Sequence, residues 1–277
     1  MDDMKELRTV VYSREMNAIE LISAGFRLFL ENIKGILLGI LIIGLPLSIL
    51  LGIVQVQLLN LTEKVQQLNT SDLYLSTQQL TEISLQMMGY YLILAAIGVF
   101  LQPILDMGFM KMTKWRLEER KFRSITAYAK SMLHTPTVLW VGLVYAICIL
   151  FASILLIPGI YLGIVWTFYL QWIALAKRKG LDALGHSRML VRGRWWRTFG
   201  FIFFVGIIVS ACSSIIGIFF PSKYVTEILS IWIAYLPTAF STCVMTVLFL
   251  NRESGLFGMG ALQEEEETQE NEETPEI

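Results

Sequence analysis

Six long apolar stretches fill most of this 277-residue chain, and they limit its possible folds more than any other feature. A helix needs about 20 apolar residues to cross the roughly 30 Å hydrocarbon core of a bilayer. Only 16% of the residues are charged, against about a quarter in soluble domains. The sequence therefore predicts an all-α integral membrane protein, a bundle of six transmembrane helices. The predicted spans lie at 35–56, 88–109, 137–157, 160–176, 198–220 and 228–250.

The positive charges predict how this bundle is oriented. Of the 22 Lys and Arg residues, 20 lie before the first span, after the second, after the fourth or after the sixth. Only Lys64 and Lys223 lie on the opposite side. Because short cytoplasmic loops are enriched in Lys and Arg, both termini are predicted to be cytoplasmic. The chain then divides into a cytoplasmic segment at 1–34, a membrane domain at 35–258 and a cytoplasmic tail at 259–277.

Three cytoplasmic segments, directly before spans one, three and five, carry a stripe of apolar residues on one helical face. Such a stripe opposite a charged face favours a helix that lies in the membrane interface. The pattern predicts three amphipathic interfacial helices and, with the two spans after each of them, a threefold internal repeat. The stripes consist of Ile19, Ile22, Phe26, Phe29 and Ile33, of Ile125, Tyr128, Ala129, Met132 and Leu133, and of Ala183, Leu184, Ser187, Leu190 and Val191.

Two further segments extend from the predicted bundle. Residues 57–87 carry apolar stripes on either side of the turn-forming residues 69–72. They predict a helical hairpin on the outer side, which either packs only on itself or binds a membrane or extracytoplasmic protein partner. The last 14 residues carry eight glutamates, so the tail has little to bury and is predicted to be disordered.

The densest group of polar side chains lies between spans four and five. The planar guanidinium of arginine suits phosphate, and tryptophan prefers the headgroup level of a bilayer. The group could therefore hold an anionic lipid headgroup or another phosphate-bearing ligand. Alternatively, its members serve only as positive-inside anchors and an aromatic belt. The candidate residues are Arg188, Arg192, Arg194, Trp195, Trp196 and Arg197.

The same region carries a resemblance to a known bacterial family. The matching residues are Ile157-Pro158-Gly159-Ile160-Tyr161-Leu162, Trp166, Ala183-Leu184, Ser187, Leu190-Val191 and Gly193-Arg194-Trp195-Trp196-Arg197. They resemble the membrane domain found with some bacterial glycerophosphoryl diester phosphodiesterases and its stand-alone multi-span relatives of uncharacterised function. Pro103, Gly108, Ser124, Ile125 and Tyr128 are similar to a pattern in a related family of bacterial six-span proteins. The resemblance implies a bacterial cytoplasmic membrane protein, but not phosphodiesterase activity, which belongs to a separate soluble barrel domain.

Asp106 is the clearest ionisable residue inside a predicted span, and such residues are functional candidates by default. Gln102 lies one turn before it, and Gln171 lies in span four. Because Asp106 is near the cytoplasmic end of its span, it could simply reach Lys111 or the interfacial water. Alternatively, it pairs with an arginine of 188–197 and closes a polar cavity.

Three classes of function remain open, and the third, an intramembrane enzyme, has no specific support in the sequence. No catalytic motif, metal-ligand cluster or nucleotide loop stands out in the sequence, so no enzyme activity, cofactor or metal is predicted. The basic residues flank spans, which argues against nucleic acid as a partner. The favoured hypothesis is a non-enzymatic multi-pass protein that binds lipid headgroups, anionic ones in particular, or a partner protein. The alternative is a transporter or exporter, or a protein of immunity or resistance to a membrane-active peptide.

Overall fold

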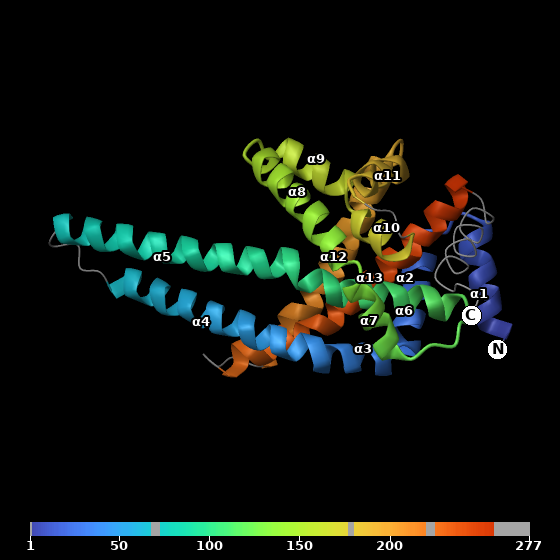
Figure 1. The fold of residues 1–277 in the computed structure, drawn as a ribbon, viewed down its shortest axis with the longest axis horizontal. Coiled ribbons are helices and arrows are strands. Elements are labelled where there is room, and N and C mark those ends of the chain that lie inside the picture. The colour runs from blue at the N-terminus through green and yellow to red at the C-terminus, as the bar shows by residue number, and fades with distance from the viewer. Residues whose placement is uncertain (1, 68–72, 177–179, 220–224, 258–277) are drawn as a thin grey trace, which may run out of the picture.

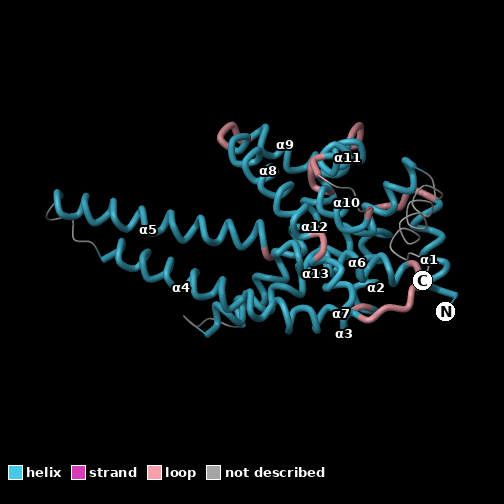
Figure 2. The backbone as a smooth tube through the Cα atoms, viewed as in Figure 1, coloured by secondary structure: helices cyan, strands magenta, loops and turns pink. Residues whose placement is uncertain are grey.

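The chain folds as a bundle of helices in the computed structural model, which describes residues 2–67, 73–176, 180–219 and 225–257. Within these residues the regular structure is entirely helical (Figure 2). The segment η1 is a single π-helical turn. The elements are α1 (Asp2–Ser13), α2 (Ala18–Glu31), α3 (Ile33–Gly39), η1 (Ile40–Gly44), α4 (Leu45–Gln67), α5 (Leu73–Phe100), α6 (Gln102–Leu117), α7 (Ser124–Met132), α8 (Thr135–Ser153), α9 (Ile157–Val165), α10 (Tyr169–Leu175), α11 (Asp182–Val191), α12 (Trp195–Phe219) and α13 (Val225–Phe257).

Six helical stretches of the described chain are long and apolar enough to cross a membrane, as the sequence predicts. Apolar side chains on their outer faces, such as Leu92, Leu150 and Phe203, are more than half exposed. Lipid tails stabilise such a surface, whereas water does not. The six stretches are Ile33–Gln67, Thr77–Leu117, Thr135–Ser153, Ile157–Leu175, Trp195–Cys212 and Ile231–Leu256.

Pro46, Pro103 and Pro237 lie within spanning stretches, at different positions of their helices. Pro103 occupies the first turn of α6, directly after the interruption that separates α5 from α6. Its missing N–H is not needed at that position. Pro46 lies in α4 just after the π-helical turn η1, and Pro237 lies inside α13. Membrane helices tolerate these residues when neighbouring groups satisfy the freed carbonyls.

The fourth spanning stretch is also interrupted, between α9 and α10, and α11 fills the break. The Ser187 hydroxyl donates a hydrogen bond to the Val165 carbonyl at 2.8 Å. It accepts one from the Phe168 N–H at 3.0 Å. Backbone groups freed within a membrane need such internal partners. Ser187 therefore fixes α11 against the bundle, with Ala183, Leu184, Leu190 and Val191 buried on the same face.

Helices α6 and α13 form the centre of the bundle (Figure 1). Every residue from Met107 to Lys114 in α6 is buried, and so is the run 246–250 in α13. Helix α13 contacts α1, α2, α4, α6 and α12. A helix that is buried on most of its circumference needs apolar residues all round, which explains why α13 has such a continuous apolar sequence.

The packing of α2 against α13 depends on small residues. The buried face of α2 consists of Leu21, Ala24, Gly25 and Leu28. The larger Ile19 is 81% exposed, so the predicted apolar stripe is turned partly away from the protein. Helices also form at the two other segments with predicted stripes, as α7 and α11. Their location in a membrane interface and the threefold repeat stay predictions.

Helices α4 and α5 lie side by side and project beyond the rest of the bundle (Figure 1). They correspond to the predicted hairpin at 57–87, with α4 reaching Gln67 and α5 starting at Leu73. The predicted turn at 69–72 and the acidic tail at 259–277 lie outside the described residues.

Candidate functional site

The structure divides the predicted arginine and tryptophan group into two sets. Arg194, Trp196 and Arg197 line a pocket, whereas Arg188 and Arg192 do not. Both of these arginines are exposed on or directly after α11. Trp195 also lies outside the pocket, where its ring stacks on Phe199 with centroids 5.4 Å apart. The charges that sequence reasoning treated as one group therefore have at least two different environments.

A tight turn between α11 and α12 places the first set. Gly193 has a φ of +76°, in the left-handed region that favours glycine. The Arg194 N–H donates to the Val191 carbonyl at 3.0 Å and closes the turn. Helix α12 then begins at Trp195. Arg197 and Phe201 lie one turn apart on the same helical face, so both face the pocket.

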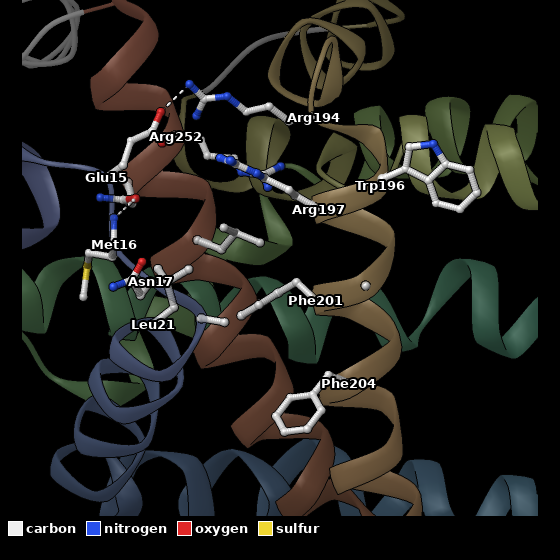
Figure 3. Close-up of a pocket in the computed structure, with 14 residues that line it drawn as sticks. Glu15, Met16, Asn17, Leu21, Arg194, Trp196, Arg197, Phe201, Phe204 and Arg252 are labelled. Carbon is white, nitrogen blue, oxygen red and sulfur yellow. Dashed lines mark hydrogen bonds and ion pairs between the residues drawn. The ribbon is translucent and has the colours of Figure 1, made fainter.

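The pocket lies at the end of the bundle where α12 begins and α13 ends (Figure 3). Its volume is about 410 Å³, within the range of small-molecule sites. Helices α12 and α13 form two of its walls. The linker between α1 and α2, together with the start of α2, forms the third. The lining side chains discussed below are Glu15, Met16, Asn17, Leu21, Arg194, Arg197, Phe201, Phe204, Leu248, Asn251 and Arg252.

Three arginines, Arg194, Arg197 and Arg252, line the polar end of the pocket, which is called the arginine pocket below. Each of them has a different environment. Arg194 forms an ion pair with Glu15. Arg252 donates to the Thr198 hydroxyl at 2.7 Å, and its guanidinium lies 5.8 Å from the centre of the Phe168 ring. Arg197 has no hydrogen-bond or ion-pair partner among the described residues. Three like charges next to a single carboxylate leave this end of the pocket with an excess of positive charge.

The opposite end of the pocket is apolar. Phe201 and Phe204 of α12, Leu248 of α13 and Leu21 of α2 form its walls. Figure 3 shows the guanidinium groups of Arg194 and Arg197 at one end, with Phe201 and Phe204 further along α12. The Trp196 ring points away from the arginines in the same view, so it does not contribute to the polar end.

Asn251 holds the linker between α1 and α2 in place at the pocket wall. Its amide nitrogen donates to the carbonyls of Val11 and Arg14, both at 2.7 Å. Its amide oxygen accepts from the Met16 N–H at 3.2 Å. A buried amide that satisfies three backbone groups fixes the linker strongly. The pocket wall is therefore preformed and does not depend on the Glu15 side chain.

The second glutamate near the linker, Glu20, is used for a different purpose. Arg14 donates to its two carboxylate oxygens at 2.8 and 3.0 Å, and the Asn17 N–H donates at 2.9 Å. The Arg14 hydrogen bond above all, and then the Asn17 bond, hold the pKa of Glu20 below its usual value. Glu20 is thus committed to the N-terminus of α2, where an acidic side chain also complements the helix dipole.

Three residues that line this pocket are not among the site residues predicted from the sequence. They are Glu15, Asn251 and Arg252, of which Arg252 enters the prediction only as the basic residue after the sixth predicted span. The available signal was weak: Asn251 and Arg252 are adjacent polar residues at the end of a long apolar run. Nothing in the linear pattern indicates that they meet Glu15, which lies more than 200 positions earlier.

The predicted intramembrane polar residues are not joined to one another. No hydrogen bond or ion pair connects Asp106 with Gln102, Gln171 or Lys111 in the described chain, nor with the arginines of 188–197. The Asp106 Oδ1, the Gln171 Oε1 and the Tyr235 hydroxyl are buried without a hydrogen-bond partner among the described residues. Asp106 also lies close enough to Tyr235 for an electrostatic interaction.

The α4–α5 hairpin, which the sequence predicts as a possible partner site, has a second hollow. Its volume is about 340 Å³, and Lys64, Gln67, Glu82 and Gln86 contribute to its lining. Apart from Ile83 this lining is polar, and it lacks an apolar wall like that of the pocket beside Arg194 and Arg197. A protein partner at 57–87 stays a prediction.

Comparisons with known proteins add no assignment. No protein-family model matches the chain, and searches of the curated proteins and of the solved structures found no match. The resemblance to the glycerophosphodiesterase membrane domain therefore stays a prediction.

Proposed function

We propose that this protein is a non-enzymatic multi-pass membrane protein that binds an anionic lipid at the arginine pocket. The observation that carries the proposal is the pocket's division into a positive end with three guanidinium groups and an apolar end with two phenylalanines and two leucines. A phosphate headgroup would bind the arginines, which form charge-assisted hydrogen bonds with phosphate. An acyl chain would contact the apolar end, which favours a lipid over a free phosphate.

The position of the arginines in the helix supports an anionic ligand. Arg194 and Arg197 lie at the start of α12, where the helix dipole is positive and disfavours cations by about 0.3–1 kcal/mol each. A bound phosphate would reverse this effect, because anions are favoured at helix N-termini. The same arginines also fit the positive-inside pattern, so we propose that this end and both termini are cytoplasmic. The bacterial plasma membrane is proposed from the resemblance alone.

The proposal is tested by removing two pocket arginines, with Arg194→Gln and Arg197→Gln in one variant. Each charged hydrogen bond contributes about 1.5–3 kcal/mol, so affinity for phosphatidylglycerol should fall by at least about tenfold. Lipid retained by the solubilised protein is measured by native mass spectrometry, and affinity by titration with phosphatidylglycerol. Phosphatidylcholine serves as the neutral probe, and glycerol phosphate distinguishes a lipid site from a site for soluble phosphates.

The matched control is the pair Arg188→Gln and Arg192→Gln. It removes the same number of charges from the adjoining part of the chain, at the end of α11, but leaves the pocket lining unchanged. Affinity in this control should change by less than about twofold, since neither side chain lines the pocket and exposed charges interact only weakly in water. Equal losses in the two variants would reduce all four arginines to anchors of topology and would overturn the proposal.

A second candidate function is transport of protons or cations through Asp106. The specific observation is that Asp106, Gln171 and Tyr235 each bury a polar atom without a partner among the described residues. An unsatisfied buried polar group costs about 1–3 kcal/mol, which is more easily explained if water or an ion binds there during function. Asp106 comes from α6 and Tyr235 from α13, the two central helices.

Asp106→Asn tests this candidate in proteoliposomes that carry a pH-sensitive dye and a membrane potential. The variant should lose proton flux while its melting temperature stays equal or rises, because asparagine removes a buried charge. Asp182→Asn, at an exposed position of α11, is the matched control. Absence of proton or cation flux in the unmodified protein would eliminate this function.

A further inference from the structure

Glu15 is the single acidic residue among the described residues that line the arginine pocket. It pairs with Arg194, although both side chains are about half exposed, at 57% and 45%. We propose that the Glu15 carboxylate is an internal competitor, which occupies the place on Arg194 that a lipid phosphate takes. Binding of an anionic lipid then displaces Glu15. This inference rests on the proposed function and describes how the same site is regulated.

The pair between Glu15 and Arg194 is suited to exchange because it is exposed. Ion pairs between exposed side chains contribute little to stability and are screened by salt. Glu15 has no other ion-pair partner within the described chain. Its side chain can therefore leave Arg194 without breaking a second ion pair.

The backbone around Glu15 does not need to move during the exchange. Asn251 holds the linker through Val11, Arg14 and Met16, on both sides of Glu15. The bidentate pair of Arg14 and Glu20 adds a further constraint. Only the rotamer of the Glu15 side chain has to change, so the exchange leaves the pocket walls intact.

A phosphate has an advantage over Glu15 because it can use all three arginines. The carboxylate forms its ion pair with Arg194 alone. Arg252 lies within electrostatic reach of Glu15 and is repelled by Arg194 and Arg197. A phosphate between the three guanidinium groups would relieve this repulsion and accept several charge-assisted hydrogen bonds. Glu15 thus neutralises part of the positive charge when no ligand is bound. A ligand must then bind the arginines tightly enough to displace Glu15 from Arg194.

The decisive experiment is a phosphatidylglycerol titration of Glu15→Gln in the full-length protein in lipid nanodiscs. Glutamine keeps the size of the side chain but removes the competing charge. Affinity should rise about twofold to fivefold, the range that an exposed ion pair can contribute. Glu6→Gln, on α1 and outside the pocket lining, removes the same charge from the same segment and should leave affinity unchanged.

A second variant shows whether Glu15 acts through Arg194. In an Arg194→Gln background, Glu15→Gln should give no further gain, because the interaction it removes is already absent. Unchanged or weaker binding in Glu15→Gln alone would overturn the inference, as would an equal gain in Glu6→Gln. If instead the unmodified protein binds no anionic lipid, or binds it independently of Arg194 and Arg197, the proposed function itself fails.

Discussion

Replacing Gly25 with alanine should force α2 away from α13 and lower the melting temperature, although alanine is the better helix former. A Cβ at Gly25 would lie 2.5 Å from the Val244 Cγ2 and 2.7 Å from the Val244 Cα. The second atom belongs to the backbone, which cannot move aside as a side chain can. Overpacking costs about 1–3 kcal/mol and occasionally more, which exceeds the gain in helix propensity of about 1 kcal/mol.

The net effect of Gly25→Ala is therefore a loss of up to about 2 kcal/mol in the free energy of unfolding, or about 4–8 °C in melting temperature. Thermal unfolding of the solubilised protein followed by circular dichroism measures it. Gly185→Ala is the matched control, because Gly185 also lies in a helix outside the six spanning stretches but has open space around its Cα. This control should be neutral or stabilising, and a Gly25→Ala variant that melts no lower than the unmodified protein would contradict the α2–α13 contact.

Gly25→Leu extends the same prediction to function. A leucine at this position cannot fit between α2 and Val244, so the helices must separate further. Leu21 lies one turn earlier on α2 and forms part of the pocket wall. Displacing α2 should therefore weaken phosphatidylglycerol binding as well as stability, whereas the arginine variants should weaken binding alone. This difference separates a damaged pocket wall from a lost charge.

The spans could be predicted from the sequence because their signal is local. Length and hydropathy of a single stretch decide whether it can cross a bilayer, and neither depends on the rest of the fold. The interruption between α9 and α10 could not be predicted in this way. It is stabilised by Ser187, which the sequence pattern places only on an apolar stripe of another helix.

The candidate site was predictable in part for the same reason. Arg194 and Arg197 are conspicuous because they lie close together in the sequence and next to tryptophans. Arg252 and Glu15 complete the pocket from opposite ends of the chain, through the packing of α2 and α12 on α13. That packing depends on small residues such as Gly25, which lies against Val244 of α13. The periodicity of a single helix does not indicate which other helix packs against its small residues.

Tyr128 of α7 packs between α3 and α6. Replacing it should cause the second large loss in the free energy of unfolding. Its hydroxyl donates to the Gly35 carbonyl at 3.0 Å, and its ring packs edge-on against Phe109 with centroids 6.3 Å apart. A Cβ at Gly39 or at Gly108 would overlap the ring. Burial raises the pKa of the Tyr128 phenol, so the hydroxyl stays a neutral donor.

Tyr128→Ala should lower the free energy of unfolding by about 3–5 kcal/mol, as for other large buried aromatic residues. Tyr128→Phe removes only the hydrogen bond to Gly35 and should cost about 1 kcal/mol. Circular dichroism melts of the two variants separate the contribution of the ring from that of the hydroxyl. Equal losses would mean that the hydroxyl, and not the ring between the glycines, holds α7 in place.

A double-mutant cycle with Gly108→Ala gives a sharper test of the contact between the Tyr128 ring and Gly108. In the unmodified protein Gly108→Ala should be destabilising by about 1–3 kcal/mol, because its methyl group meets the Tyr128 ring. In the Tyr128→Ala background the ring is absent, so the same change should be neutral or stabilising through helix propensity. The coupling energy between the two positions should therefore reach about 2 kcal/mol, well above the value for independent sites. Additive effects would show that Gly108 accommodates something other than Tyr128.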